Sequence, residues 1–181
     1  GVQNGQVNAD VAATSGAEVA VAGVVQDKGN KVYNVEFQVV GLQGANKGKV
    51  LAHYKGDSSL ATMRQASHRI SDRIYEAFTG QRGCFRTRIA YVVTKFGAPF
   101  PYQLMTADYD GYNETPIVKS TQPIMTPSWS PDGRRLAYVS FEKRSPAIFV
   151  QDIISKKRQK LASFSGLNSS PAWSPDGTKI A

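Results

Sequence analysis

The sequence predicts an α+β N-terminal domain, built from hairpin strands and an amphipathic helix, followed by the all-β blades of an incomplete β-propeller. Residues 32–39 alternate between apolar and polar side chains as a half-buried strand does, and residues 60–78 repeat apolar side chains every three or four positions as a helix does. The phrase WSPDG then occurs twice, at residues 129–133 and 173–177, among short apolar runs separated by turns. We therefore expect an N-terminal domain over residues 1–82 and part of a propeller over residues 83–181.

The first two expected strands form a hairpin. In residues 32–39, VYNVEFQV, the apolar side chains of Tyr33, Val35, Phe37 and Val39 fall on one face, and Asn34, Glu36 and Gln38 fall on the other. The apolar run at residues 18–25 precedes this strand across a turn at residues 26–30 that contains Asp and Gly, as two antiparallel strands require. A third strand is expected near residues 49–55.

An amphipathic helix is expected after these strands. Asp57, Ser58 and Ser59 are available as N-cap groups, and Gly80 can adopt the left-handed conformation that ends a helix. One helix on three strands gives a thin core, so we expect a further covering segment before Gly1. The expected apolar face consists of Leu60, Met63, Ser67, Ile70, Ile74, Ala77 and Phe78, and the expected polar face of Arg64, Gln65, Arg69, Asp72, Arg73 and Glu76.

The repeat predicts propeller blades. Trp129 and Trp173 are 44 residues apart (173 − 129), and roughly 40 to 45 residues make one four-stranded blade. Residues 88–92, RIAYV, also resemble residues 135–139, RLAYV, so they take the same blade position. The strands expected from this alignment are 88–92, 103–107 and 116–119 in a first blade and 126–130, 135–141, 147–151 and 159–164 in a second. A third blade has its first strand at 170–174 and the beginning of its second at 178–181.

Blades of three, four and fewer than two strands cannot close a ring of roughly 4 to 8 blades. We therefore expect the chain to be a fragment of a longer protein, in which a strand from elsewhere completes the first blade.

The repeated phrase contains the residues of a strand-to-strand turn. Proline fixes the backbone angle of the first central turn position, aspartate accepts main-chain N–H groups, and glycine adopts a positive φ. Tryptophan is large enough to fill the space between neighbouring blades. We predict structural rather than catalytic roles for Trp129, Pro131, Asp132 and Gly133 and for their counterparts Trp173, Pro175, Asp176 and Gly177.

No catalytic or metal-binding constellation stands out. His53 and His68 lack the spacing of a zinc motif, and the sequence contains no nucleophile elbow, P-loop or dinucleotide fingerprint. Residues 108–111, DYDG, lack the further ligands of a calcium loop and read as a turn. We expect Cys84 to be a small packed residue. The prediction is therefore a protein that is not an enzyme, with no catalytic residue, no metal ligand and no cofactor, and with partner-binding residues unknown.

The net charge of +8 favours acidic partners, but its distribution weakens that interpretation. The only dense basic run, Lys156, Lys157, Arg158 and Lys160, lies at an expected hairpin turn, where a solvated charge run is ordinary. No aromatic side chains are interleaved with it, so nucleic acid is not an expected partner. No run approaches the ~20 apolar residues of a membrane helix, and residues 1–10 lack the pattern of a signal peptide.

Three longer stretches of the sequence resemble the TolB family, propeller proteins of the Tol-Pal system of Gram-negative bacteria. These stretches are GCFRTRIAYVV at residues 83–93, PYQLMTADYDGYN at residues 101–113 and TPSWSPDGRRLAYVSFE at residues 126–142, and the resemblance extends over roughly residues 18–181. At the position of Cys84 the family more often has a small residue such as alanine.

The resemblance implies an α/β N-terminal domain followed by a six-bladed propeller, a cleaved signal peptide and a periplasmic location. It implies a non-enzymatic scaffold that binds the lipoprotein Pal through the propeller and TolA through the extreme N-terminal segment, and that maintains outer-membrane integrity and its constriction at cell division. Some colicins use such proteins for import. Neither partner's contacts can be transferred to individual residues of this sequence.

Two alternatives stay open at the level of sequence. WSPDG-like repeats also occur in the propellers of serine peptidases, whose catalytic domain would lie outside residues 1–181. The basic surface could instead mark an anion-binding module centred on Lys156, Lys157 and Arg158.

Overall fold

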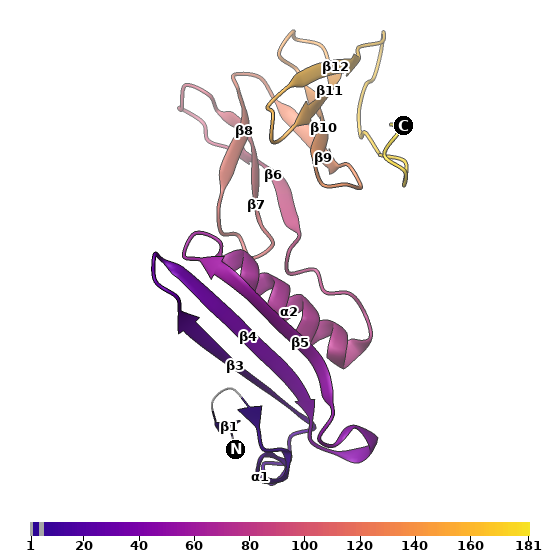
Figure 1. The fold of residues 1–181 in the computed structure, drawn as a ribbon. Coiled ribbons are helices and arrows are strands. Elements are labelled where there is room, and N and C mark those ends of the chain that lie inside the picture. The colour runs from indigo at the N-terminus through magenta and orange to yellow at the C-terminus, as the bar shows by residue number, and fades with distance from the viewer. Residues whose placement is uncertain (1, 4–5) are drawn as a thin grey trace. The chain divides into compact units, whose positions relative to one another are not determined.

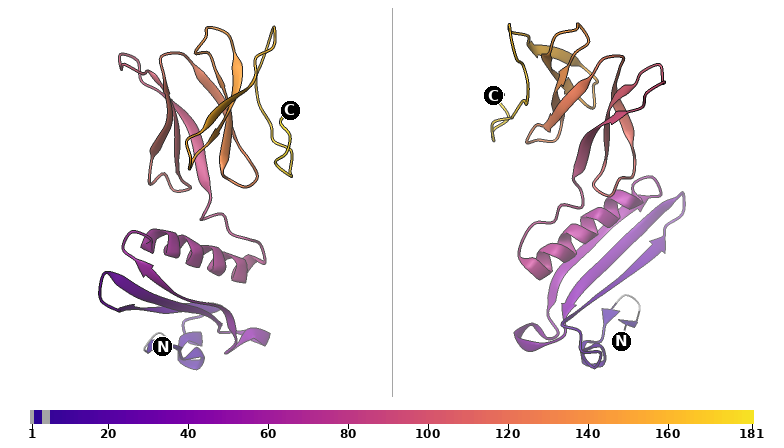
Figure 2. Two further views of the ribbon diagram at one scale, coloured as in Figure 1. Left: turned by 45° about the horizontal axis from the view of Figure 1, so that its top comes forward. Right: turned by 180° about the vertical axis from the view of Figure 1, so that it is seen from behind.

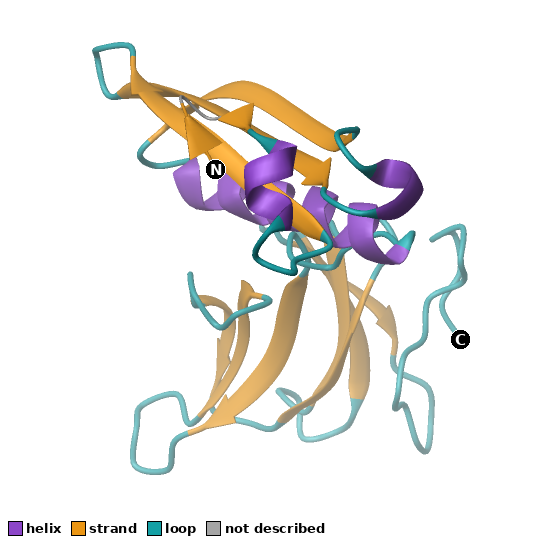
Figure 3. Cartoon of the chain, turned by 90° about the horizontal axis from the view of Figure 1, so that it is seen from below, coloured by secondary structure: helices purple, strands orange, loops and turns teal. Residues whose placement is uncertain are grey.

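The computed structural model describes residues 2–3 and 6–181, which form two compact units that divide between Thr87 and Arg88 (Figure 1). Unit 1 contains all the helical segments of the described residues, whereas unit 2 consists of strands and loops (Figure 3). This arrangement confirms the predicted fold class, a mixed N-terminal part followed by propeller-like sheets.

Unit 1 is built on a three-stranded antiparallel sheet with the order β3-β4-β5. The strands are β3 (Val19–Asp27), β4 (Val32–Gly41) and β5 (Val50–Ser59), and α2 (Met63–Thr79) lies over β5 and β4 (Figure 1). The smaller elements are β1 (Val2–Gln3), β2 (Gln6–Val7), α1 (Ala9–Ala13) and the 3-10 turn η1 (Gly44–Asn46). The pairing of β3 with β4 confirms the predicted hairpin.

The core of unit 1 follows the alternation of β4. Val35, Phe37 and Val39 are buried, as is Ala66 on α2, and the ring of Phe37 stacks on Tyr54 of β5 with centroids 6.1 Å apart. Every second residue of β4 therefore contributes to one apolar layer, as the period of a half-buried strand predicts.

The predicted start of the helix was wrong. β5 continues through Ser59, and α2 begins only after Thr62, so Asp57, Ser58 and Ser59 do not cap it. Instead the Thr62 hydroxyl accepts the Ser59 main-chain N–H at 3.0 Å and closes the turn between strand and helix. The predicted end is confirmed, because Gly80 has a φ of 68° and its N–H donates to the Glu76 carbonyl.

Four side chains of the helical pattern were assigned to the wrong environment, and one of them, Ser67, is exposed rather than buried. Leu60 lies in the turn before α2 and is 62% exposed, and Phe78 is 54% exposed rather than buried. Asp72, expected on the polar face, is buried. Helical periodicity cannot identify these exceptions, because they depend on which neighbouring segments cover each face.

Asp72 is buried because the segment after α2 folds back over it. Its carboxylate accepts the Phe85 N–H at 2.8 Å and the Arg86 Nε–H at 2.7 Å. At Gly83 a Cβ atom would approach Asp72 Oδ1 to 2.5 Å, so glycine permits this close approach. The segment 83–87 therefore packs within unit 1, and the two compact units divide five residues beyond the expected boundary at 82/83.

Unit 2 contains two antiparallel sheets side by side (Figure 2). The first has the order β6-β7-β8 and consists of β6 (Arg88–Thr94), β7 (Tyr102–Asp108) and β8 (Thr115–Ser120). The second has the order β12-β11-β10-β9 and consists of β9 (Ile124–Trp129), β10 (Arg135–Ser140), β11 (Ala147–Asp152) and β12 (Arg158–Ala162).

After these two sheets a further pair of extended segments begins near the end of the described chain, where Ala172 and Ala181 exchange two main-chain hydrogen bonds of 2.9 Å. The strands thus follow the predicted sequence of three, four and the beginning of a further blade. Within the described residues the sheets do not close into a ring.

An apolar core joins the two sheets of unit 2. Tyr138 and Phe149 stack with ring centroids 6.0 Å apart, and side chains from both sheets surround them. Burial raises the pKa of the Tyr138 hydroxyl to about 12, so this phenol stays neutral at physiological pH. The buried members of the cluster are Leu104, Ile124, Leu136, Tyr138, Ala147 and Phe149.

The strand registers sort the loops of unit 2 into two ends. Ser140 pairs with Ala147 and with Ile124, so the loops before and after these strands gather at one end. We call this the apolar-loop end; it comprises loops 95–101, 121–123, 141–146 and 163–169 (Figure 1). The opposite end, which we call the PDG end, comprises loops 109–114, 130–134, 153–157 and 174–179.

Candidate partner-binding surfaces

Each copy of WSPDG forms a closed turn at the PDG end. In the first copy the Ser130 N–H donates to the Arg135 carbonyl at 2.9 Å and the Gly133 N–H donates to the Ser130 carbonyl at 2.8 Å. The Asp132 carboxylate accepts the Ser130 hydroxyl at 2.5 Å and the Arg134 N–H at 3.0 Å, and these bonds lower the pKa of Asp132. Gly133 has a φ of 65°, which glycine adopts without strain.

The second copy repeats this geometry. The Asp176 carboxylate accepts the Ser174 hydroxyl at 2.5 Å and the Thr178 N–H at 3.0 Å, and the pKa of Asp176 is lowered for the same reason. Gly177 has a φ of 68°. The serine and aspartate side chains of both motifs are thus hydrogen-bonded within their own turns.

One arginine connects each turn to the preceding sheet. The Arg88 guanidinium lies 5.1 Å from the centre of the Trp129 ring and donates to the Gly133 carbonyl at 2.9 Å. The Arg135 guanidinium lies 4.6 Å from the centre of the Trp173 ring and donates to the Gly177 carbonyl at 3.0 Å. We call this contact the Arg–Trp clamp.

The Arg–Trp clamp was missed at the level of sequence. The alignment of RIAYV with RLAYV superposes Arg88 and Arg135, and that shared first residue was the available signal. Trp173 adds a second link across the blade boundary, because its Nε1–H donates to the Ser128 carbonyl at 3.1 Å. The corresponding Trp129 Nε1 is buried, and no described residue accepts a hydrogen bond from it.

The apolar-loop end exposes large apolar side chains. Phe96 is 81% exposed, Phe164 77% and Leu167 85%. The loop that carries Phe164 is held by a buried side chain, since Asn168 Oδ1 accepts the Phe164 N–H at 3.0 Å and Asn168 Nδ2 donates to the Phe164 carbonyl at 2.8 Å. Apolar groups presented on an ordered loop are typical of protein-binding surfaces.

The basic run at the PDG end is divided between two environments. Lys156 and Lys157 are exposed in the turn between β11 and β12, as expected. Arg158 is the first residue of β12, and its partly exposed guanidinium lies 3.8 Å from the centre of the Phe149 ring and donates to Glu142 at 2.8 Å. This residue therefore covers the edge of the apolar core.

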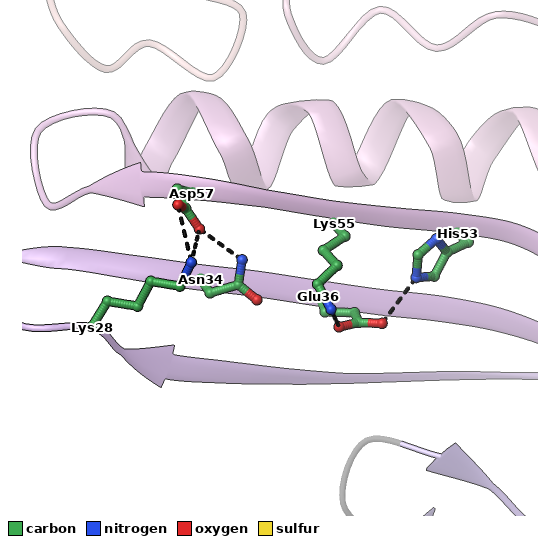
Figure 4. Close-up of polar contacts among 6 residues, drawn as sticks. All are labelled: Lys28, Asn34, Glu36, His53, Lys55 and Asp57. Carbon is green, nitrogen blue, oxygen red and sulfur yellow. Dashed lines mark hydrogen bonds and ion pairs between the residues drawn. The ribbon is translucent and has the colours of Figure 1, made fainter.

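His53 takes part in a polar network on the exposed face of β4 and β5 (Figure 4). The Glu36 carboxylate contacts His53 Nε2 at 3.1 Å and Lys55 Nζ at 2.8 Å, and the bond to Lys55 is the main cause of its lowered pKa. Asp57 similarly binds Asn34 and Lys28, and its pKa is lowered. Such exposed ion pairs contribute little stability individually. Within residues 2–3 and 6–181, no group of acidic, His or Cys side chains could hold a metal ion.

Two remaining candidates are structural. Loop 108–111 is a turn in which the Asp108 N–H donates to the Tyr112 carbonyl at 2.8 Å and Gly111 has a φ of 81°. The expectation that Cys84 is packed was wrong: this residue is exposed, and its carbonyl accepts the Thr87 N–H at 3.0 Å.

Adjacent antiparallel sheets joined by recurrent turns and Arg–Trp clamps define a β-propeller repeat protein, a class that presents its binding loops on a rigid scaffold. Within this class the chain belongs to the TolB family, because its residues 75–181 match the family model described as TolB beta propeller domain.

The relatives of this chain carry the same family name. Tol-Pal system protein TolB of Mannheimia succiniciproducens is 46% identical over 167 residues, which are 91% of this chain and 38% of that protein. The protein of the same name from Thioalkalivibrio sulfidiphilus is 47% identical over 164 residues, 90% of this chain and 37% of that protein. The crystal structure of TolB from Acinetobacter baumannii superposes with a TM-score of 0.86 at 36% identity, covering 97% of this chain and 43% of that one.

The chain therefore spans less than two fifths of the length of these curated relatives. Among the helices in the part of the chain that the structure describes, none combines the length and the apolar character needed to cross a membrane.

Proposed function

We propose that the chain is a portion of a non-enzymatic, periplasmic scaffold protein of the Tol-Pal system, which binds Pal and TolA-type partners to maintain outer-membrane integrity and its constriction at cell division. The names of the relatives support a role in the Tol-Pal system. A scaffold rather than an enzyme is favoured by the repeated motif, whose serine and aspartate side chains are hydrogen-bonded within the turns.

The observation that carries this proposal is the exposure of Phe164 and Leu167 on the ordered loop 163–169. Burying such side chains against a partner would remove apolar surface from water, at about 25 cal/mol per Å². We assign the Pal contact to this apolar-loop end. No residue is assigned to TolA, because the resemblance locates that contact in a segment that this sequence does not match.

The test uses the full-length protein and the soluble domain of Pal from the same bacterium. Replacing Phe164 and Leu167 by Asp should weaken the affinity for Pal, measured by isothermal titration calorimetry, at least tenfold, or about 1.4 kcal/mol. Both side chains are exposed, so the thermal unfolding temperature should change little.

Ile154→Asp is the matched control. Ile154 is 71% exposed and lies on a loop of the PDG end, so the same change is made to a similar side chain at the opposite end of the blades. Pal affinity should be unchanged in this variant. Equal affinities for all three proteins, or equal losses in both variants, would contradict the assignment.

A further inference from the structure

The outer edge of β5 is a second surface that this function does not use. In the described part of the chain the sheet of unit 1 has the order β3-β4-β5, so β5 pairs on one side with β4 and has no strand on the other. An unpaired strand edge presents main-chain N–H and C=O groups that can bond to an added strand.

Charged side chains of α2 follow this edge. Arg69, Arg73 and Glu76 are spaced four and three residues apart, which places them in one row along the helix. The row lies on the side of β5, since Arg69 Nη1 donates to the Tyr54 hydroxyl at 3.5 Å. Arg73 contacts Glu76 at 3.4 Å while its side chain remains 59% exposed.

A hollow of about 400 Å³ separates the row from the strand edge. Its lining includes apolar, polar and charged residues, so it can accept side chains of more than one kind. The lining residues are Leu51, Ala52, His53, Arg73, Glu76 and Ala77. An added strand would lie about 4.8 Å from β5, with its side chains directed alternately toward the hollow and toward the opposite face of the sheet.

We propose that this groove binds an extended acidic segment of a partner protein, which adds to the edge of β5 as a further strand. Two guanidinium groups and one carboxylate leave the α2 row with a net positive charge, although Arg73 and Glu76 pair with each other at 3.4 Å. Carboxylates on the face of the added strand that is directed toward α2 would meet Arg69 and Arg73. Main-chain bonds to β5 supply affinity, and the two arginines select acidic side chains.

The test measures binding of a fluorescent peptide, acetyl-DVDVDVD-amide, to the full-length protein that contains these 181 residues, by fluorescence anisotropy. The peptide should bind, and the charge-reversed peptide acetyl-KVKVKVK-amide should bind at least tenfold more weakly. The double variant Arg69→Glu/Arg73→Glu should weaken binding of the acidic peptide at least tenfold. The matched control Lys31→Glu/Arg82→Glu makes the same charge change at two other exposed positions of unit 1 and should leave binding unchanged.

Strand addition is tested separately from charge. Two versions of the acidic peptide carry N-methyl groups on the valines or on the aspartates, so each blocks one edge of the extended peptide. One version should lose binding and the other should keep it. Amide exchange of residues 51–55 in the wild-type chain should slow when the peptide is added, a measurement that does not depend on how the variants fold.

The proposal is overturned if the acidic peptide does not bind, or if Arg69→Glu/Arg73→Glu and the control Lys31→Glu/Arg82→Glu bind it with equal affinity. Equal affinities of the two methylated peptides would overturn it as well. Loss of Pal binding through the apolar-loop end would not affect any of these results, because the groove belongs to unit 1.

Discussion

The two units use charged side chains differently to hold their segments together. In unit 1 a single buried carboxylate, Asp72, binds two groups of the segment that follows α2. In unit 2 the Arg–Trp clamp occurs at two successive blade boundaries, and its guanidinium groups lie over indole rings near the surface. A buried single contact concentrates stability in one group, because its loss leaves polar partners unsatisfied. A repeated contact distributes stability over neighbouring repeats.

The largest effect is expected from the tryptophan of the first clamp. Trp129 packs against the core of unit 2 and also supports Arg88, so Trp129→Ala should lower the free energy of unfolding of that unit by about 3 kcal/mol. Trp173 is outside that core cluster, and Trp173→Ala should cost less than half as much. Urea unfolding, followed by amide exchange in each unit, measures both losses. Equal losses would mean that the two clamps are energetically equivalent despite their different packing.

A smaller effect is expected from the single contact of unit 1. Asp72→Ala leaves the Phe85 N–H and the Arg86 guanidinium without their acceptor and should lower the stability of unit 1 by about 2 kcal/mol. Asp72→Asn retains one acceptor oxygen and should lose less. Limited proteolysis at residues 80–87 reports the effect directly. If both variants resist cleavage as the wild type does, Asp72 does not anchor this segment.

The smallest effect is expected from the turn carboxylates. Hydrogen bonds from Ser130 and Ser174 lower the folded-state pKa of Asp132 and Asp176 below the ordinary value of 3.8. Their contribution is therefore complete above that value and is lost as the pH falls through the lower folded-state pKa. Between pH 5 and pH 2 the melting temperature of unit 2 should fall less in an Asp132→Asn/Asp176→Asn variant than in the wild type. Parallel curves for the two proteins would exclude this contribution.

The repeat made most of unit 2 predictable from sequence. Two copies of WSPDG, with RIAYV and RLAYV beside them, identify the strands, their order and the position of each turn, because every blade meets the same local requirements. In unit 1 no motif is repeated, so each element had to be predicted from its own local pattern. Alternation identified its hairpin, whereas the start of α2 and the burial of Asp72 depend on contacts with β5 and with segment 83–87.

The candidate surfaces were harder to predict. The exposure of Phe164 and Leu167 depends on how loop 163–169 is held by Asn168. The residue type alone does not tell whether an apolar side chain is buried or exposed. The groove beside β5 requires a helix and a strand edge to be placed together. Both surfaces are tertiary features, and the sequence alone left the partner-binding residues unknown.

The Arg–Trp clamp also gives the row of blades a direction. Each arginine reaches forward to the turn of the following blade, so the contact joins unlike surfaces, head to tail, and every boundary can be added without altering the one before it. The Arg–Trp clamp therefore does not determine how many blades the ring contains. The number needed for closure must then follow from the small rotation between successive sheets, so a substitution that changed this angle would alter the size of the ring while leaving each clamp intact.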